Sequence, residues 1–197
     1  MKQVLIIHGG TSFDSYESYL DALETSSIDY ERLKKAESWQ DWLPSALPGV
    51  DVLQPGFPNK QNAQFHEWEI YIEKLLPLLG NQVSLVGYSL GAMFLAKYLH
   101  QKPLKSPVDR LILIAGAYND SSNEELGSFA VESARGLETS ANEVHLFHSQ
   151  DDPVSPFSEL AKYQSDLPTA ISHIFIDRNH FFQESFPELA EVLARDI

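Results

Sequence analysis

The sequence contains no cysteine. A disulfide framework, a thiolate nucleophile and a metal site built on cysteine are therefore excluded. Covalent chemistry must use serine, threonine, lysine, histidine or a carboxylate. Long hydrophobic runs are also missing, because no stretch approaches the ~18 apolar residues of a membrane span. Strand-like sequence begins by the third residue with no signal peptide ahead of it, so we expect a cytoplasmic protein.

Positive charge is scarce as well. The chain has 14 Lys and Arg residues against 28 Asp and Glu residues, and its formal net charge is −14. Nucleic-acid binding depends on Lys and Arg displacing the counterions of the phosphate backbone. A strongly acidic surface repels that backbone, so we expect no nucleic-acid partner.

Apolar material is plentiful by contrast. Of the 197 residues, 43% are hydrophobic and 11% are aromatic. A chain of this length can bury about 70% of the surface that its unfolded form exposes. The composition therefore predicts one domain with a sizeable core.

Six short apolar runs have the length and composition of buried strands. They are VLIIH at 4–8, VDVL at 50–53, QVSLVG at 82–87, RLILIAG at 110–116, VHLFHS at 144–149 and ISHIFID at 171–177. Continuous apolar runs are typical of strands covered on both faces. Residues 64–79 and 89–99 place apolar side chains three or four apart, as in amphipathic helices. This alternation predicts an α/β fold, a parallel sheet with helices on both faces.

Two segments interrupt the alternation. Residues 11–49 hold helical-looking fragments that contain Trp and Tyr, and residues 119–143 are polar and acidic. Each is either a set of solvated helices and loops or a cap over a pocket, since long connections in compact domains are often lids. No repeat or linker divides the chain. We therefore expect a single domain over residues 1–197, with cap excursions at 11–49 and 119–143.

The chemistry concentrates in the sequence GYSLG at residues 87–91. This is the G-x-S-x-G nucleophile elbow, in which a strand turns so sharply into a helix that the serine backbone is strained. An apolar run precedes it and an amphipathic stretch follows it, as the motif requires. Ser89 is the predicted nucleophile. The alternative is a tight turn in which the serine has no chemical role.

A serine hydroxyl needs a base to take its proton, and that base needs an anion to orient it. In this fold class the chain order is serine, acid, histidine. His173 lies within the sixth run and should pack on a sheet face, whereas His180 follows the strand, where ligands bind in open α/β sheets. His180 is therefore the predicted base. Asp152 is the preferred acid because it precedes a proline in a turn, with Asp151 as rival and Asp120 as a more distant third; either member of the pair also suits a helix cap.

An oxyanion needs two donors. One is expected from the backbone N–H of Leu90, and the second from the loop HGGT at 8–11, through Gly10 or Thr11. That loop lacks the spacing of a phosphate-binding motif. An apolar acyl pocket is expected from aromatic residues near the predicted strand ends, namely Tyr88, Phe13, Tyr118, Phe129 and Phe181.

No metal site or cofactor is expected. His145 and His148 lie three apart on one predicted strand, so their side chains point to opposite faces of the sheet and cannot share an ion. Acidic residues are abundant, but no pattern places two of them together as a glycosidase would need.

Four segments carry a resemblance to a known family. VLIIHGG at the start, GYSLGAMFLAKYL at 87–99, the stretch DDPVSP at 151–156 and NHFF near the end resemble the small α/β-hydrolases of the RBBP9/YdeN family of serine hydrolases. QPGFPN at 54–59 is similar to that family's loop after the second strand. The resemblance is faint over 11–49 and 119–143. It implies a trimmed three-layer α/β-hydrolase fold with strand order 2-1-3-4-5-6, and Ser89, Asp152 and His180 as nucleophile, acid and base.

The residues and the resemblance together predict an acyl hydrolase acting on a small-molecule ester or thioester. Ser89 attacks the carbonyl, His180 relays the proton and Asp152 orients the imidazole. Because fold and function often part company, the second hypothesis is a binding or interaction protein of hydrolase shape with a vestigial site. The sequence leaves the oligomeric state open.

Overall fold

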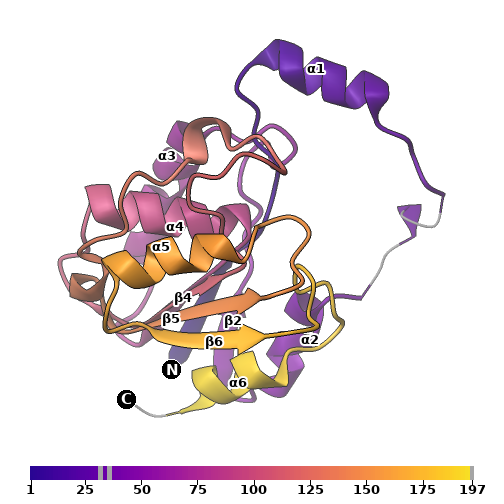
Figure 1. Cartoon of the computed structure of the whole chain (residues 1–197). Helices are drawn as coiled ribbons and strands as arrows, with labels where there is room; N and C mark the ends of the chain where they lie inside the picture. Colours follow the sequence, from indigo (N-terminus) through magenta and orange to yellow (C-terminus); the bar gives the residue numbers. More distant parts are fainter. Residues whose placement is uncertain (31–32, 35–36, 196–197) are drawn as a thin grey trace.

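The computed structural model describes residues 1–30, 33–34 and 37–195. In this part of the chain, six parallel strands form one sheet in the order β2-β1-β3-β4-β5-β6 (Figure 1). The strands are β1 (Lys2–Ile7), β2 (Val50–Leu53), β3 (Val83–Tyr88), β4 (Val108–Ile114), β5 (Ala141–Ser149) and β6 (Ile171–Phe175). Each lies at one of the six predicted runs, so the predicted α/β fold, its parallel sheet and its strand order are confirmed.

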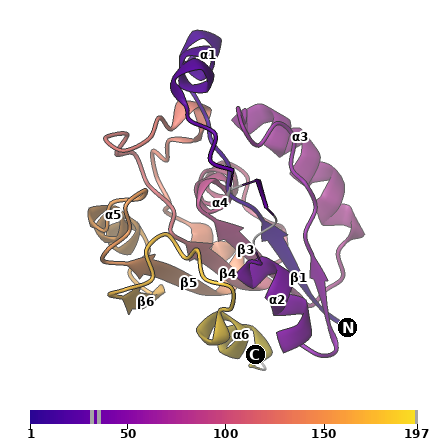
Figure 2. The same cartoon turned by 90° about the vertical axis from the view of Figure 1, so that its right-hand side faces the viewer.

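Helices cover both faces of the sheet (Figures 1 and 2). One face carries α3 (Phe65–Leu75), α4 (Leu90–Gln101) and α5 (Ser158–Asp166); the other carries α2 (Trp39–Ala46) and α6 (Pro187–Ala194). Short 3-10 turns occur at η2 (Leu76–Leu78), η3 (Gly127–Phe129) and η4 (Leu137–Thr139). The predicted helical segments 64–79 and 89–99 correspond to α3 with η2 and to α4.

The two faces explain why the strands read as continuous apolar runs. Successive side chains of a strand point to opposite faces. In β1, Leu5 and Ile7 join the core beneath α3, α4 and α5, whereas Val4 and Ile6 join the core beneath α2 and α6. Leu5 pairs in register with Leu53 of β2 and Leu85 of β3. Both faces of the central strands are thus removed from water, which favours apolar residues at every position.

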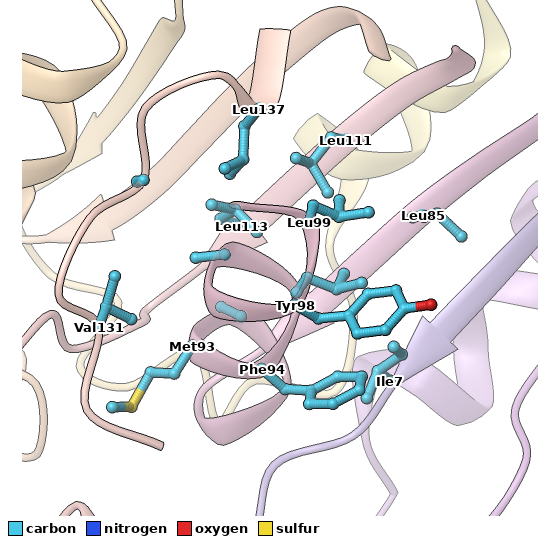
Figure 3. Packing of buried hydrophobic residues seen from close by; sticks show 14 of the residues in the cluster. Ile7, Leu85, Met93, Phe94, Tyr98, Leu99, Leu111, Leu113, Val131 and Leu137 are labelled. Atoms are coloured by element: carbon cyan, nitrogen blue, oxygen red, sulfur yellow. The ribbon is translucent and has the colours of Figure 1, made fainter. Parts of the chain in front are cut away.

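Helix α4 is the centre of the larger core. Nine of its 12 residues are buried. Figure 3 shows it packed against Ile7, Leu85, Leu111 and Leu113 of the sheet on one side and near Val131 and Leu137 on the other. Its Phe94 ring is surrounded by the rings of Phe57, Phe65, Trp68, Tyr98 and Phe129, with centroids 5.4–6.4 Å away.

The segment 119–143 contributes to this core. Val131, Ala134 and Leu137 are buried in it. The Asp166 carboxylate on α5 accepts hydrogen bonds from the Tyr118 hydroxyl (2.6 Å), the Ala134 N–H (2.8 Å) and the Arg135 guanidinium (2.9 Å). The second half of this segment is therefore fixed over α4 and α5.

The segment 11–49 is arranged differently. Helix α1 (Tyr16–Thr25) stands away from the rest of the fold and has no buried residue, while α2 packs beneath the sheet (Figures 1 and 2). Residues 31–32 and 35–36 of this segment lie outside the described residues. A capping box between Ser15 and Ser18 begins α1, so the helix has a defined start without help from the core.

Two histidines, His145 and His173, lie side by side on β5 and β6. His173 stacks on Phe147 with ring centroids 4.1 Å apart, and its Nε2 lies 3.0 Å from Nδ1 of His145. Burial lowers the pKa of His173 to about 4, helped by the neighbouring His145, and burial also lowers the pKa of His145. His173 thus packs on a sheet face, as expected, and takes no part in the site described below.

We expect Phe94→Ala to lower the free energy of unfolding by about 3–5 kcal/mol, because a buried aromatic side chain leaves a cavity when it is truncated. Urea unfolding measures the change. Phe182→Ala makes the same truncation at a side chain that is 66% exposed, and should change stability by no more than about 0.5 kcal/mol. Similar losses in both variants would contradict this account of the core.

The histidine pair should make stability depend on pH. Between the folded pKa of His173, about 4, and the value of ~6.5 for an unfolded histidine, the unfolded chain binds more protons. The contribution of this pair is therefore complete above pH ~6.5 and is lost as the pH falls toward 4. His173→Phe, which keeps a ring on Phe147, should flatten the fall in Tm over this window. His66→Phe, at an exposed histidine, should leave the fall unchanged; an equal effect of the two variants would exclude the pair as its origin.

Candidate active site

Ser89 lies at the junction of β3 and α4, in a strained backbone conformation. Its φ is 54° and its ψ is −119°, which non-glycine residues rarely adopt. The turn is tight enough that a Cβ at Gly87 would collide with the backbone of Gly91 and Ala92, and one at Gly91 with the carbonyl oxygen of Ile7. The two glycines of the motif are thus required by close backbone contacts. The predicted strand–turn–helix setting is present.

A continuous hydrogen-bond chain joins Ser89, His180 and Asp152. Nε2 of His180 lies 2.9 Å from Oγ of Ser89, and Nδ1 lies 2.8 Å from Oδ2 and 3.0 Å from Oδ1 of Asp152. A carboxylate only accepts hydrogen bonds, so Nδ1 carries the proton and Nε2 is free to accept the one from the serine hydroxyl. His180 is 4% exposed and Asp152 is 8% exposed, so the chain is largely shielded from water.

The two neighbouring aspartates have different partners. Asp152 Oδ1 also accepts the N–H groups of Val154 (2.8 Å) and Ser155 (2.9 Å), which fix the carboxylate in its turn. Asp151 accepts from the Ser149 hydroxyl (2.5 Å) and the Asn179 N–H (2.9 Å). The structure brings the carboxylate of Asp152, and not that of Asp151, to the His180 imidazole. Asp151 instead stabilises the loop that carries His180.

The loop around His180 is bent by two unusual residues. Asn179 and Phe181, on either side of the histidine, both have positive φ, 47° and 55°. The Tyr88 hydroxyl donates to the carbonyl oxygen of His180 at 2.7 Å. Backbone bends and this hydrogen bond together place the imidazole over Ser89.

Gly10 and Thr11 are the two candidates for the second oxyanion donor, and the Thr11 N–H is unavailable. The Thr11 N–H donates to the carbonyl oxygen of Lys60 at 2.9 Å, which corrects the expectation for this residue. The Gly10 N–H has no hydrogen-bond partner among the described residues. The Leu90 N–H begins α4, where helix geometry provides no partner. Gly10 and Leu90 are therefore the two amides left for an oxyanion.

His8 fixes the peptide that carries the Gly10 N–H. The Phe57 N–H donates to Nε2 of His8 at 2.8 Å, so Nδ1 carries the proton and donates to the Gly9 carbonyl oxygen at 2.6 Å. Burial lowers the pKa of His8, which favours this neutral form. A Cβ at Gly10 would lie 2.5 Å from the Lys60 carbonyl oxygen, so this position requires glycine.

A small cavity lies over the hydrogen-bond chain, and we call it the inner cavity. Its volume is about 20 Å³, room for about one water molecule. Ser89, His180, Leu90 and Gly10 line it, together with Thr11, Ser12, Met93, Ala115, Ala117, Asp120, Glu124, Glu125, Leu126, Val154 and Ser155. Asp120 thus borders the site but takes no part in the hydrogen-bond chain.

A wider depression of about 370 Å³, the outer groove, lies beside the inner cavity. Its walls come from two segments, Thr11, Ser12 and Phe13 on one side and Ser121, Ser122, Asn123, Glu124 and Glu125 on the other. Hydrogen bonds from the Asp14 N–H and the Ser18 hydroxyl to Glu125 join these segments. The two excursions expected as caps therefore meet at the edge of the site.

The expected aromatic pocket is largely wrong. Phe129 and Phe181 are buried in the two cores, and Tyr118 is buried against Tyr163 and Asp166. Tyr88 supports His180 from outside the inner cavity, and only Phe13 lines the outer groove. The side chains of Phe129, Phe181 and Tyr118 turn into the protein, because packing in the core removes more apolar surface from water than exposure in a hydrated cleft does.

Sequence reasoning missed Glu124, Glu125 and Ser155 as residues of the site. Glu124 and Glu125 lie in the polar segment after β4, and the carboxyl end of a strand is the signal that draws attention to such a segment. Ser155 follows Asp152 in the same turn.

Comparisons with known proteins agree with this geometry. The model of a family described as serine hydrolase matches residues 32–191. The chain belongs to this family of serine hydrolases. The predicted membership in the RBBP9/YdeN group of hydrolases is confirmed. A comparison with curated sequences found no match.

Several solved structures match nearly the whole chain. The ydeN gene product of B. subtilis is 22% identical, with a TM-score of 0.75 over 98% of this chain and 97% of that one. An esterase from Exiguobacterium antarcticum is 14% identical, with a TM-score of 0.60 over 98% and 90%. The thioesterase domain from the curacin biosynthetic pathway is 13% identical, with a TM-score of 0.59 over 98% and 91%. These similarities establish the α/β-hydrolase fold.

Two further observations concern the described residues of this hydrolase. None of their helices is long and apolar enough to cross a membrane. They contain no cluster of three or more metal-ligating side chains, and His145 and His148 have separate partners, His173 and the Ser155 carbonyl oxygen.

The two aspartates give a test of the site. Asp152→Asn should slow the reaction of Ser89 with a fluorophosphonate probe about a hundredfold or more, because an amide no longer holds the tautomer that leaves Nε2 free. Asp151→Asn is the matched control and should slow it less than about tenfold, since it acts only through the loop. Equal losses would contradict the assignment of Asp152.

Proposed function

We propose that this serine hydrolase cleaves small carboxylic esters or thioesters through an acyl-enzyme on Ser89. The observation that carries the proposal is the hydrogen-bond chain from Oγ of Ser89 through His180 to Asp152, with distances of 2.9 and 2.8 Å. A serine in this position loses its proton to the imidazole as it attacks, and the carboxylate stabilises the imidazolium that forms.

The reaction follows in two halves. Oγ of Ser89 bonds to the carbonyl carbon, its proton passes to Nε2 of His180, and the N–H groups of Leu90 and Gly10 stabilise the oxyanion. The bond to the leaving group then breaks as Nε2 returns the proton to it. In the second half a water molecule attacks the acyl-enzyme and His180 takes its proton; Nε2 then returns the proton to Oγ as the bond between Oγ and the acyl carbon breaks and the acid product leaves.

The site favours esters and thioesters over peptides. Alcohol and thiol leaving groups depart more readily than amines, and no Lys or Arg that could bind a peptide carboxylate is among the described residues that line the inner cavity and the outer groove. The small inner cavity suits a short acyl group. Two of the similar structures bear the names esterase and thioesterase, in line with this substrate class.

The second candidate is a binding module of hydrolase shape. The fold by itself is compatible with either role. The intact hydrogen-bond chain and the two free amide donors favour the enzyme, because a binding module has no use for an activated serine.

Labelling of Ser89 tests the proposal directly. The wild-type protein should react with a fluorophosphonate probe, and p-nitrophenyl acetate should leave an acetyl group on Ser89 that mass spectrometry detects. Ser89→Ala should show neither reaction. Ser106→Ala removes an exposed hydroxyl in the loop before β4 and should react like the wild type. Folded wild-type protein that resists several such probes would overturn the enzyme and favour the binding module.

A further inference from the structure

The inner cavity and the outer groove are neighbours that share part of their walls. Thr11, Ser12, Glu124 and Glu125 line both. The inner cavity has room for about one water molecule, whereas the groove is about 370 Å³ in volume. The groove is therefore the neighbouring space with room for the larger part of a substrate whose carbonyl reaches Ser89.

The formal charge along the inner cavity and the outer groove is negative. Asp120, Glu124 and Glu125 line these two spaces, and no Lys or Arg is among the described residues that do. Two of the three carboxylates have structural partners: Asp120 accepts the Ser122 N–H, and Glu125 accepts the Asp14 N–H and the Ser18 hydroxyl. Within the described part of the chain, Glu124 has no hydrogen bond and no ion pair. Its carboxylate is the one left for a ligand.

Glu124 lines the inner cavity together with Ser89 and His180 of the hydrogen-bond chain. Burial raises the pKa of Glu124 and the Asp152 charge raises it further, while His180 acts in the opposite direction. Glu124 is an exposed residue that lines the inner cavity, and a cation bound beside it would offset the repulsion between its carboxylate and that of Asp152.

A second, independent feature of the cavity also lacks a partner. Ser155 is 2% exposed, and its Oγ has no hydrogen-bond partner among the described residues. The Ser155 N–H donates to Asp152 and its carbonyl oxygen accepts from His148, so Oγ is the polar group that remains. Leaving a buried hydroxyl unsatisfied is unfavourable, and a bound polar group that donates a hydrogen bond to it removes that cost.

Glu124 and Ser155 come from different loops that are tied together. The side-chain amide of Asn123 donates to the Pro153 carbonyl oxygen at 3.1 Å and to that of Val154 at 3.3 Å. This contact joins the segment after β4 to the turn after β5. Both unpartnered groups thereby line the same inner cavity.

We propose that the leaving group of the substrate carries an ammonium group, whose charge Glu124 neutralises and whose N–H donates to Oγ of Ser155. This inference rests on the proposed function and specifies its substrate. The ammonium belongs to the leaving group because that group must reach Nε2 of His180 to receive its proton, and Glu124 lines the same cavity as that histidine. The acyl group is short, since it shares the narrow inner cavity.

Three thioesters of nearly identical shape test the charge. S-Acetylthiocholine carries a quaternary ammonium, S-(3,3-dimethylbutyl) thioacetate replaces the nitrogen by carbon, and S-acetyl-3-mercaptopropionate carries a negative charge. The released thiol is measured with a thiol-reactive dye. We expect kcat/KM for the cationic thioester to exceed that for its neutral isostere about tenfold, as for a charge pair at a partly solvated site. The anionic thioester should be cleaved most slowly, and the preference should shrink as ionic strength rises.

Glu124→Gln should reduce the preference for the cationic thioester to about twofold or less. Glu132→Gln is the matched control, since Glu132 is an exposed acid in the same 119–143 segment but lines neither the cavity nor the groove. It should leave the preference intact. If Glu124→Gln slows both thioesters equally, Glu124 acts through His180 and not on the substrate, and the proposal is overturned.

Ser155→Ala tests the hydrogen bond separately. Wild type should cleave S-acetyl-2-(dimethylamino)ethanethiol, whose protonated amine has one N–H, about threefold faster than S-acetylthiocholine, which has none. Ser155→Ala should abolish this difference. A difference that survives the substitution overturns the assignment of Oγ as the acceptor. Removing an unsatisfied hydroxyl should leave the protein folded.

Failure of the proposed function gives a different result. If no thioester is cleaved and Ser89 is not labelled, the proposed hydrolysis fails, and binding to the Ser89→Ala protein then decides the inference alone. Calorimetry should show tighter binding of S-acetylthiocholine than of its neutral isostere, and Glu124→Gln should remove the difference. Equal binding of the two thioesters overturns the ammonium site.

Discussion

The turn at Ser89 is the constraint on which the rest of the site depends. Its backbone lies in a conformation that serine rarely adopts, held there because Gly87 and Gly91 permit contacts with neighbouring backbone that any side chain would block. That turn directs Oγ toward the edge of the sheet where the other strands also end. It also begins α4, so the Leu90 N–H faces the same space as the serine oxygen.

The remaining groups converge because parallel strands end at one edge. Asp152 follows β5, His180 follows β6, and Gly10 follows β1. Each loop is fixed by its own hydrogen bonds: Asp151 holds the histidine loop, two backbone N–H groups hold Asp152, and His8 holds the peptide of Gly10. Such supporting contacts keep catalytic groups within the narrow geometric limits that proton transfer needs.

The acidic residues that line the site of this hydrolase differ in whether they have hydrogen-bond partners. Glu125 and Asp120 serve the local structure, whereas Glu124 and the Ser155 hydroxyl have no partners within the described protein. Polar groups that are left unsatisfied at a cleft indicate the chemistry of what binds there. Here they are a carboxylate and a hydroxyl in the cavity that the imidazole also lines, which favours a cationic hydrogen-bond donor over an apolar chain.

Local sequence patterns determined the strands, the alternation with helices, the elbow at Ser89 and the order of serine, acid and histidine, because strand burial and sharp turns restrict residue types within a few positions. The tertiary structure alone decided between Asp151 and Asp152, removed Thr11 as an oxyanion donor by pairing it with Lys60, and turned Phe129 and Phe181 into the core. It also placed Glu124 and His180 in the lining of one cavity and left the Ser155 hydroxyl without a partner among the described residues. Each of these outcomes depends on a contact between segments distant in the chain, and such contacts leave no local pattern to read.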